Sequence, residues 1–270
     1  MTPIANARMY AVTPEAESAW ADLLGHVADD AGVALRYEPY PAPRPLDALW
    51  RRPDLGAGFM CGFPIAVGMA DVVPLAAPVP DAPWAGGRAL YRSDFIVRAD
   101  SPARILEDTF GGTIGWTATH SHSGFNAPRH HLRAFRPVHG GRLYRGSLGD
   151  LVTPRGVLDA VLERRIDVGP LDAYWHLLLR RYRPDLADGV RVVASTDPAP
   201  LPAIVAARGR PSVEVAALGR AFAAAAGRPW FPPLAGALCI SGFERVTRDD
   251  YAMIVRWAEE AGDARYAAPA

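Results

Sequence analysis

Residues Gly111 to Leu132 read GGTIGWTATHSHSGFNAPRHHL, and this stretch decides the fold. It predicts a short strand over Thr113 to Thr117, a polar turn over 119–124, and then a helix. The first backbone N–H groups of a helix have no partner within it, and the helix dipole adds positive charge at the same end. We therefore expect this hydroxyl-rich turn to hold a negatively charged ligand.

The start of that helix has two interpretations. Either it begins at Gly124, directly after the serines, or Asn126 caps it in front of Ala127 and Pro128. Both place the serine-rich turn in front of the helix. The alternative is that the serines only cap the helix and serve the fold.

Strands and helices alternate before this stretch. Thr13 followed by Pro14 is typical of a helix start, and Gly32 is placed to end that helix. This alternation predicts an α/β fold with a mostly parallel sheet in each lobe, flanked by helices. The predicted elements are a strand over Ala7 to Val12, a helix over Glu15 to Ala31, a strand over Val33 to Tyr37, a short helix over Leu46 to Arg51, a strand over Leu55 to Cys61 and a strand over Val72 to Ala77.

The stretch Arg88 to Arg98 predicts a long strand. Two long strands, near Tyr91 to Arg98 and near Val190 to Ser195, bracket a central block with its own strands and helices. A chain that leaves one lobe, builds a second and returns gives two lobes, 1–92 with 191–270 and 93–190, and two hinge crossings. We expect the ligand in the cleft between them. The remaining predicted elements are the helix Pro154 to Arg164 behind Thr153, the strand Ile166 to Val168, the helix Leu171 to Arg181, the strand Ile204 to Ala207, and the helices Ser212 to Ala226 and Arg248 to Ala261.

The composition excludes several classes of protein. Lys plus Arg and Asp plus Glu are both 29, so the chain lacks the basic excess of a nucleic-acid binder. No apolar run approaches the roughly 20 residues that a membrane span needs. The two cysteines, Cys61 and Cys239, form no CxxC motif, so we expect no metal cluster and no cofactor, while one disulfide is allowed but not implied.

In its order of short motifs, the chain resembles the phosphonate/phosphate-type substrate-binding proteins of ABC transporters, which have the type II periplasmic-binding-protein fold. The resemblance covers most of the chain. It implies a two-lobed protein that binds a small anionic ligand. The motifs that carry it are Ala7-Arg-Met-Tyr10, Met60-Cys-Gly-Phe-Pro64, Tyr91-Arg-Ser-Asp94 through Arg98-Ala-Asp-Ser101, Leu106-Glu-Asp108 with Gly111, Ser121-His-Ser-Gly124 with Pro128, and Asp167-Val-Gly-Pro-Leu-Asp172.

The resemblance also implies ligand-binding residues. The family's anion cradle is a Ser-Thr-Ser-Gly turn before a helix, and it matches Ser121, His122, Ser123 and Gly124, with His122 replacing the threonine. Asp172 matches an acidic residue that faces a ligand amino group, although an acid in the first turn of a helix is also favourable without any ligand. The residues that match ligand-facing stretches of the first lobe and the hinge are Tyr10, Gly62, Phe63 and Tyr91.

Other polar residues have competing interpretations. A metal site at His120, His122, His130 and His131 is weaker than a single His122 facing the ligand, where its charge would depend on pH. Cys61 beside Gly62 is better explained as a buried structural thiol than as a nucleophile. The aromatic side chains near the turn and in the second lobe suit the core better than a ligand wall.

The leading hypothesis is a solute-binding protein that captures a phosphonate, phosphate ester or carboxylate for ABC-type uptake, with a permease as partner. The alternative is a cytoplasmic enzyme or ligand-handling protein of the same fold, of the pyrimidine-cofactor or menaquinone-biosynthesis type. A cytoplasmic sensor or scavenger is a third option. The N-terminus has no apolar signal region, so the location is periplasmic if a signal was trimmed and cytoplasmic if Met1 is the native start.

Overall fold

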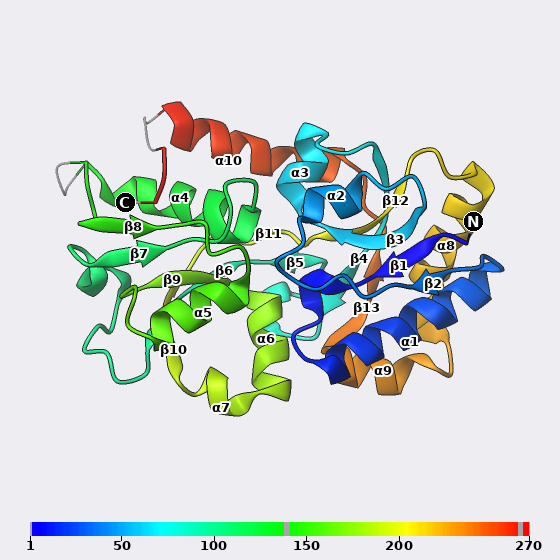
Figure 1. Cartoon of the computed structure of the whole chain (residues 1–270), viewed down its shortest axis with the longest axis horizontal. Coiled ribbons are helices and arrows are strands. Elements are labelled where there is room, and N and C mark those ends of the chain that lie inside the picture. The colour runs from blue at the N-terminus through cyan, green and yellow to red at the C-terminus, as the bar shows by residue number, and fades with distance from the viewer. Residues whose placement is uncertain (1, 138–140, 264–266, 270) are drawn as a thin grey trace. The chain divides into compact units, whose positions relative to one another are not determined.

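The computed structural model describes residues 2–137, 141–263 and 267–269. These residues belong to two compact units (Figure 1). Unit 1 comprises residues 1–91 and 200–252, and unit 2 comprises residues 92–199 and 253–270. The chain therefore passes from one unit to the other at three places in the sequence. The predicted lobes group the C-terminal helix with the first lobe, and this lobe assignment stays a prediction.

Unit 1 is built on a six-stranded sheet. The strands of unit 1 are β1 (Ile4–Asn6), β2 (Arg36–Tyr37), β3 (Leu55–Met60), β4 (Val72–Pro80), β5 (Leu90–Tyr91), β12 (Ala203–Ala207) and β13 (Ile240–Glu244). Its helices are α1 (Pro14–Ala31), α2 (Leu46–Trp50), α3 (Gly62–Val67), α8 (Ser212–Ala224) and α9 (Phe231–Leu238). Its 3-10 turns are η1 (Arg8–Tyr10), η2 (Pro83–Ala85), η6 (Ala225–Gly227) and η7 (Asp249–Tyr251).

The sheet of unit 1 is mixed, which corrects the prediction of mostly parallel strands. Its order is β13-β4-β12-β3-β1-β2. β1 pairs in parallel with β2 and β3, whereas β12 is antiparallel to both β3 and β4, and β13 is antiparallel to β4. The strand–helix alternation identified only the parallel part. The direction of β12 is set by long-range pairing, because β12 returns from unit 2 and enters the sheet between β3 and β4.

Local signals placed the first helix correctly. Thr13 caps α1 by accepting a hydrogen bond from the Ala16 N–H, and Gly32 ends it in the left-handed conformation with φ of 64°. The buried face of α1 carries Trp20, whose ring meets Phe59 of β3 edge-on at 4.9 Å. α1 also packs against α8 and α9, as can be followed in Figure 1.

The predicted opening strand over Ala7 to Val12 is wrong. The strand is three residues earlier, and Arg8 to Tyr10 form the 3-10 turn η1. The reason is local: the Asn6 side-chain oxygen accepts a hydrogen bond from the Arg8 N–H at 2.9 Å, which turns the chain out of the sheet.

Unit 2 is assembled around smaller sheets. The strands of unit 2 are β6 (Ser93–Arg98), β7 (Thr113–Gly115), β8 (Gly146–Leu148), β9 (Gly169–Asp172) and β10 (Val190–Ser195), while β11 (Ala199–Pro200) includes the last residue of one segment and the first of the next and pairs with β5. Its helices are α4 (Ala127–Leu132), α5 (Pro154–Leu162), α6 (Ala173–Tyr182), α7 (Pro184–Ala187) and α10 (Ala252–Asp263, from Met253 on). It also contains the 3-10 turns η3 (Leu106–Thr109) and η5 (Arg133–Phe135) and the π-helical turn η4 (His122–Asn126).

The central sheet of unit 2 has the order β10-β6-β9 and is antiparallel throughout, and β7 pairs in parallel with β8. The predicted strand over Ile166 to Val168 is wrong, because the strand at this place is β9, which includes Gly169 and Pro170. Both residues disfavour strands, but β9 lies at the edge of its sheet, where proline is tolerated. Pairing with β6 therefore overrides the local preference.

Two further differences concern boundaries and missed elements. The predicted strand Arg88 to Arg98 is divided at Arg92 into β5 and β6. α9 and β13 were not predicted, and Cys239 separates them in the left-handed conformation, with φ of 51°. Within the described ranges, no helix has both the length and the apolar character to cross a bilayer.

Candidate functional site

The predicted ligand turn lies in unit 2 between β7 and α4. Ser121, the first residue of the Ser121–Gly124 motif in this turn, caps η4, because its hydroxyl oxygen accepts a hydrogen bond from the Gly124 N–H at 3.0 Å. The helix therefore starts before Asn126, as a π-helical turn over His122–Asn126 that continues into α4. His122, Ser123 and Gly124 are buried and Ser121 is half-buried, so the turn does not face open solvent.

The peptide that joins Ser123 to Gly124 is fixed at both ends. Its carbonyl accepts a hydrogen bond from the buried Ser93 hydroxyl at 2.8 Å, and its N–H is the one that Ser121 caps. The Gly124 carbonyl in turn accepts from the Thr117 N–H at 3.2 Å. The orientation of the main chain in this turn is thus set before any ligand arrives.

Gly124 can only be glycine in this arrangement. A Cβ atom at this position would lie 1.9 Å from the Thr117 hydroxyl oxygen and 2.8 Å from the Thr117 Cβ. The close approach of the two backbone segments therefore requires the missing side chain. The glycine of the quoted Ser-His-Ser-Gly motif has a packing reason that is independent of any ligand.

His122 is neutral at physiological pH. Burial, and to a smaller extent the charge of His130, lowers the pKa of the His122 imidazole to about 3. The expected pH dependence of the His122 charge therefore falls in acid, near the lowered pKa of about 3, and not near neutral pH. The ring lies 5.6 Å from the indole of Trp257, tilted by 32°.

Asp172 is the N-cap of α6 rather than a residue of its first turn. Its carboxylate Oδ1 accepts hydrogen bonds from the N–H groups of Tyr174 at 2.9 Å and Trp175 at 3.0 Å. Asp172 also pairs with Ser93 in the register of β9 and β6, and β9 packs against η4. The structure therefore brings Asp172 to the turn, with Ser93 as the link.

Ser93 is the residue that the sequence interpretation did not single out. It is 1% exposed and joins three parts of unit 2, since its N–H donates to the Thr196 hydroxyl oxygen at 3.0 Å and its own hydroxyl donates to the Ser123 carbonyl. It stands inside the quoted motif Tyr91-Arg-Ser-Asp94. The available signal in the sequence was a polar serine at the start of a strand that is predicted to be buried.

The other predicted ligand residues lie in unit 1. Tyr10 and Tyr91 are each 1% exposed, and the Tyr10 ring meets Phe59 edge-on at 4.9 Å. Gly62 is buried at the start of α3, and Phe63 beside it is half-buried. Within unit 1 these residues serve the core and a helix start, and their role toward a ligand stays a prediction.

The histidines and cysteines have separate surroundings. His130 stacks on Trp257 with ring centroids 4.7 Å apart, while His131 packs against Phe95 at 5.4 Å. Across the part of the chain that the structure describes, no three His, Cys, Asp or Glu side chains converge as metal ligands would. Cys61 and Cys239 are not joined to each other by a disulfide bond.

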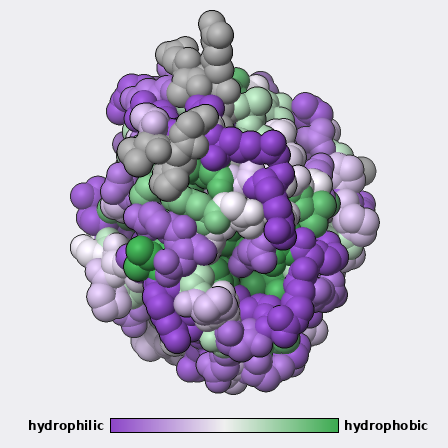
Figure 2. Space-filling model, turned by 90° about the vertical axis from the view of Figure 1, so that its left-hand side faces the viewer, coloured by the Kyte–Doolittle hydropathy of each residue, from purple (hydrophilic) through white to green (hydrophobic). Residues whose placement is uncertain are grey.

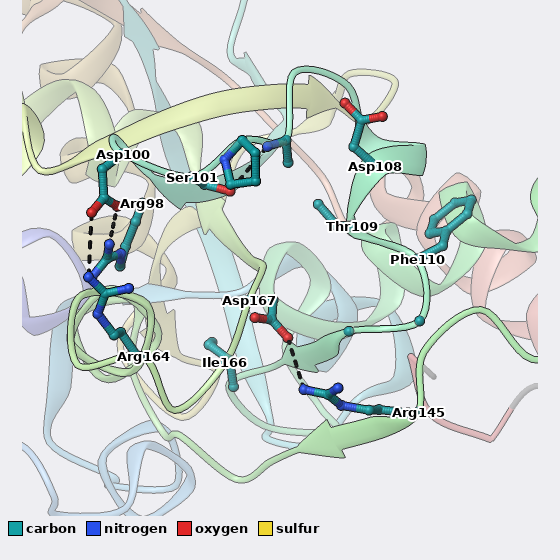
Figure 3. A pocket seen from close by; sticks show the side chains of 14 residues that line it. Arg98, Asp100, Ser101, Asp108, Thr109, Phe110, Arg145, Arg164, Ile166 and Asp167 are labelled. Carbon is teal, nitrogen blue, oxygen red and sulfur yellow. Dashed lines mark hydrogen bonds and ion pairs between the residues drawn. The ribbon is translucent and has the colours of Figure 1, made fainter.

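A hollow of about 470 Å³ lies in unit 2, and none of the residues that line it belongs to the turn (Figure 3). Its arginines already face carboxylates: Arg98 and Arg164 pair with Asp100, and Arg145 lies 3.9 Å from Asp167. Figure 2 shows that hydrophilic residues predominate on this side of unit 2, with hydrophobic residues in recesses between them. The positive charges of this hollow are matched by negative ones, so it offers little net charge to an anionic ligand. Ligand binding at the turn stays a prediction.

Comparison with known proteins identifies the family. The family model described as "ABC transporter, phosphonate, periplasmic substrate-binding protein" matches residues 11–251. The chain belongs to this family. Its members are substrate-binding components of transporters, and the resemblance found in the short motifs is thereby confirmed. Among curated proteins, none matches the chain.

Solved structures share the α/β fold of this chain. A binding protein component of an ABC phosphonate transporter from Pseudomonas aeruginosa is 18% identical, with a TM-score of 0.80 over 98% of this chain and 88% of that one. A protein from Prochlorococcus marinus in complex with methylphosphonate is 14% identical, with a TM-score of 0.72 over 96% and 98%. A protein from Xanthomonas citri bound to ATP is 21% identical, with a TM-score of 0.64 over 98% of both chains. The predicted fold class is confirmed.

Proposed function

We propose that this substrate-binding protein captures a small metabolite through a phosphonate, phosphate ester or carboxylate group at the Ser121–Gly124 turn, and that it delivers this metabolite to an ABC permease. The observation that carries the proposal is the fixed peptide between Ser123 and Gly124, held by Ser93 on one side and Ser121 on the other. A preorganised main chain loses little entropy when an oxyanion binds.

The hydroxyl groups of the turn support the same ligand class. Within the described residues, the Ser123 hydroxyl has no hydrogen-bond partner in the protein, although Ser123 is only 8% exposed. A hydroxyl group and a helix start are suitable donors for an oxyanion without a cationic side chain. The neutral state of His122 is consistent with a site that relies on such dipoles rather than on net charge.

The ligand class is tested by titration calorimetry and thermal shift with methylphosphonate, inorganic phosphate, a phosphate monoester and malate as probes. A bound probe raises the melting temperature, because it stabilises only the folded state. We expect the Ser121→Ala/Ser123→Ala double variant to bind about tenfold more weakly or worse, since each lost hydrogen bond contributes about 1 kcal/mol.

The matched control is the Ser18→Ala/Ser212→Ala double variant, which removes two exposed serine hydroxyls from unit 1. Its affinity should equal that of the unmodified protein. If none of the four probes raises the melting temperature, the proposed ligand class is wrong. If the Ser121/Ser123 variant binds as well as the control, the turn is not the binding site.

A further inference from the structure

The C-terminal helix α10 is attached along the side of α4, the helix that continues the ligand turn. Arg129 donates to the Ala258 carbonyl at 2.9 Å, and Arg133 pairs with Glu260 at 2.8 Å. His130 lies between them and meets the Glu260 carboxylate at 3.0 Å. Polar contacts thus join α10 to α4 and to η5, the 3-10 turn that follows α4, all within unit 2.

Trp257 of α10 makes the contact that reaches the turn itself. Its indole stacks on His130, with the ring planes 3° from parallel, and the same indole lies 5.6 Å from the ring of His122. One side chain therefore touches both α4 and the second residue of the Ser121–Gly124 turn. The ion pairs around Glu260 are partly exposed and contribute little by themselves, so the aromatic contacts dominate this attachment.

Trp257 and Ser93 contact neighbouring residues of the turn, and they reach it from different elements. Ser93 fixes the Ser123 carbonyl from β6, whereas Trp257 contacts the preceding residue, His122, from α10. The two contacts come from segments that enter unit 2 at different crossings, before Arg92 and before Met253. The turn is therefore held by both chain segments that form unit 2.

We infer that Trp257 is a positioning residue of the ligand turn, which acts through His122 and His130 and makes ligand affinity depend on α10. This inference rests on the proposed function for its consequence in binding. The positioning itself is a property of the ligand-free protein. A purely structural tryptophan would stabilise unit 2 as a whole, whereas a positioning residue restrains the turn more than its surroundings.

Hydrogen exchange measured by mass spectrometry on the full chain without ligand separates these two roles. We expect Trp257→Leu to raise the exchange rate of peptides covering 117–126 at least tenfold, while peptides covering β6 and β10 change less than twofold. Trp257→Tyr keeps an aromatic ring against His130 and should restore most of the protection. The tyrosine variant also keeps the test valid if the leucine variant does not fold.

The chain offers a matched control in unit 1. Trp230 stacks on His26 with centroids 5.0 Å apart and planes 8° from parallel, and it is half-buried like Trp257. Trp230→Leu removes the same kind of stack and should leave peptides covering 117–126 unchanged. The inference is overturned if Trp257→Leu leaves these peptides unchanged, or if it raises exchange equally in β6 and β10.

A second measurement connects the exchange data to binding. For any probe that binds the unmodified protein, methylphosphonate being the first choice, Trp257→Leu should weaken binding at least fivefold, and Trp257→Tyr should recover it. If no probe binds the unmodified protein, the proposed function fails, yet the exchange experiment still decides whether Trp257 positions the turn. Equal affinity of Trp257→Leu and Trp230→Leu would overturn the role of α10 in binding.

Discussion

His122 shows how burial determines the state of a single side chain in the turn. A histidine has an ordinary pKa of about 6.5 and is partly charged in weak acid. In the folded protein, burial and His130 keep the imidazole neutral down to a pH near its lowered pKa of about 3. Between about pH 6.5 and pH 3, His122 is therefore protonated in the unfolded chain but neutral in the folded chain.

This difference predicts that protonation of His122 in the unfolded state destabilises the fold as the pH falls. The contribution is fully present above the unfolded pKa, near 6.5, and is lost progressively below it. Between pH 7 and pH 4.5, we expect the unmodified protein to lose on the order of 2 kcal/mol more unfolding free energy than His122→Asn. Urea denaturation at both pH values measures this, with exposed His26→Asn as the control for loss of a histidine. Parallel pH profiles for the protein and His122→Asn would contradict the prediction.

At the scale of elements, the two helix starts that have a complete local signal could be predicted, and the strand pairings could not. Thr13 and Thr153 each cap a helix with proline behind them, and both caps are present because the signal is complete within four residues. β9 contains Gly169 and Pro170, and only its pairing with β6 makes it a strand. A single sequence contains no signal that β9 pairs with β6. The last residues of β9 were therefore predicted as the start of α6, two residues too early.

The residues of the candidate site show the same difference between local signals and long-range contacts. Ser121 and Gly124 could be identified from the quoted motif, because a serine-rich turn before a helix has a local physical meaning. Ser93 and Trp257 could not, because they reach the turn from β6 and from α10, 28 or more positions away in the sequence. Long-range contacts of this kind follow from the tertiary fold and not from spacing.

The cap of α6 gives a test at this scale. Asp172→Ala removes the acceptor of two backbone N–H groups at the helix start, and it should lower the unfolding free energy by about 1–2 kcal/mol. Asp172→Asn keeps an oxygen in place and should cost less. Chemical denaturation of both variants measures the difference, with exposed Asp188→Ala as the control. Equal stability of the alanine and control variants would exclude a capping role for Asp172.

At the scale of the whole molecule, each unit is made from two separated segments of chain. Unit 1 needs residues 200–252 to complete its sheet with β12 and β13, and unit 2 receives α10 from residues 253–270. The family could be predicted because its motifs occur in order along most of the chain, and the family match over residues 11–251 confirms it. That match stops before α10, so the motifs contained no information on which unit the last helix joins.

Removal of residues 253–270 tests this division. The truncated chain keeps every strand of the six-stranded sheet but loses the partners of Arg129, His130 and Arg133. We expect unit 2 to unfold at a lower urea concentration while unit 1 keeps its unfolding midpoint. Unfolding then has two transitions, and the curves followed by tryptophan fluorescence and by far-UV circular dichroism no longer coincide. A single transition at the original midpoint would show that α10 is dispensable for unit 2.

The placement of β12 and β13 at the far end of the sequence has a consequence for biosynthesis. β12 occupies an interior position of its sheet, between β3 and β4, so residues 1–91 cannot complete their core when they leave the ribosome. Domains usually fold one after another as they emerge, but here the earliest strands must wait until more than 200 residues have been translated. During that interval β3 and β4 expose unpaired edges, and a nascent chain in this condition is a natural client for chaperones.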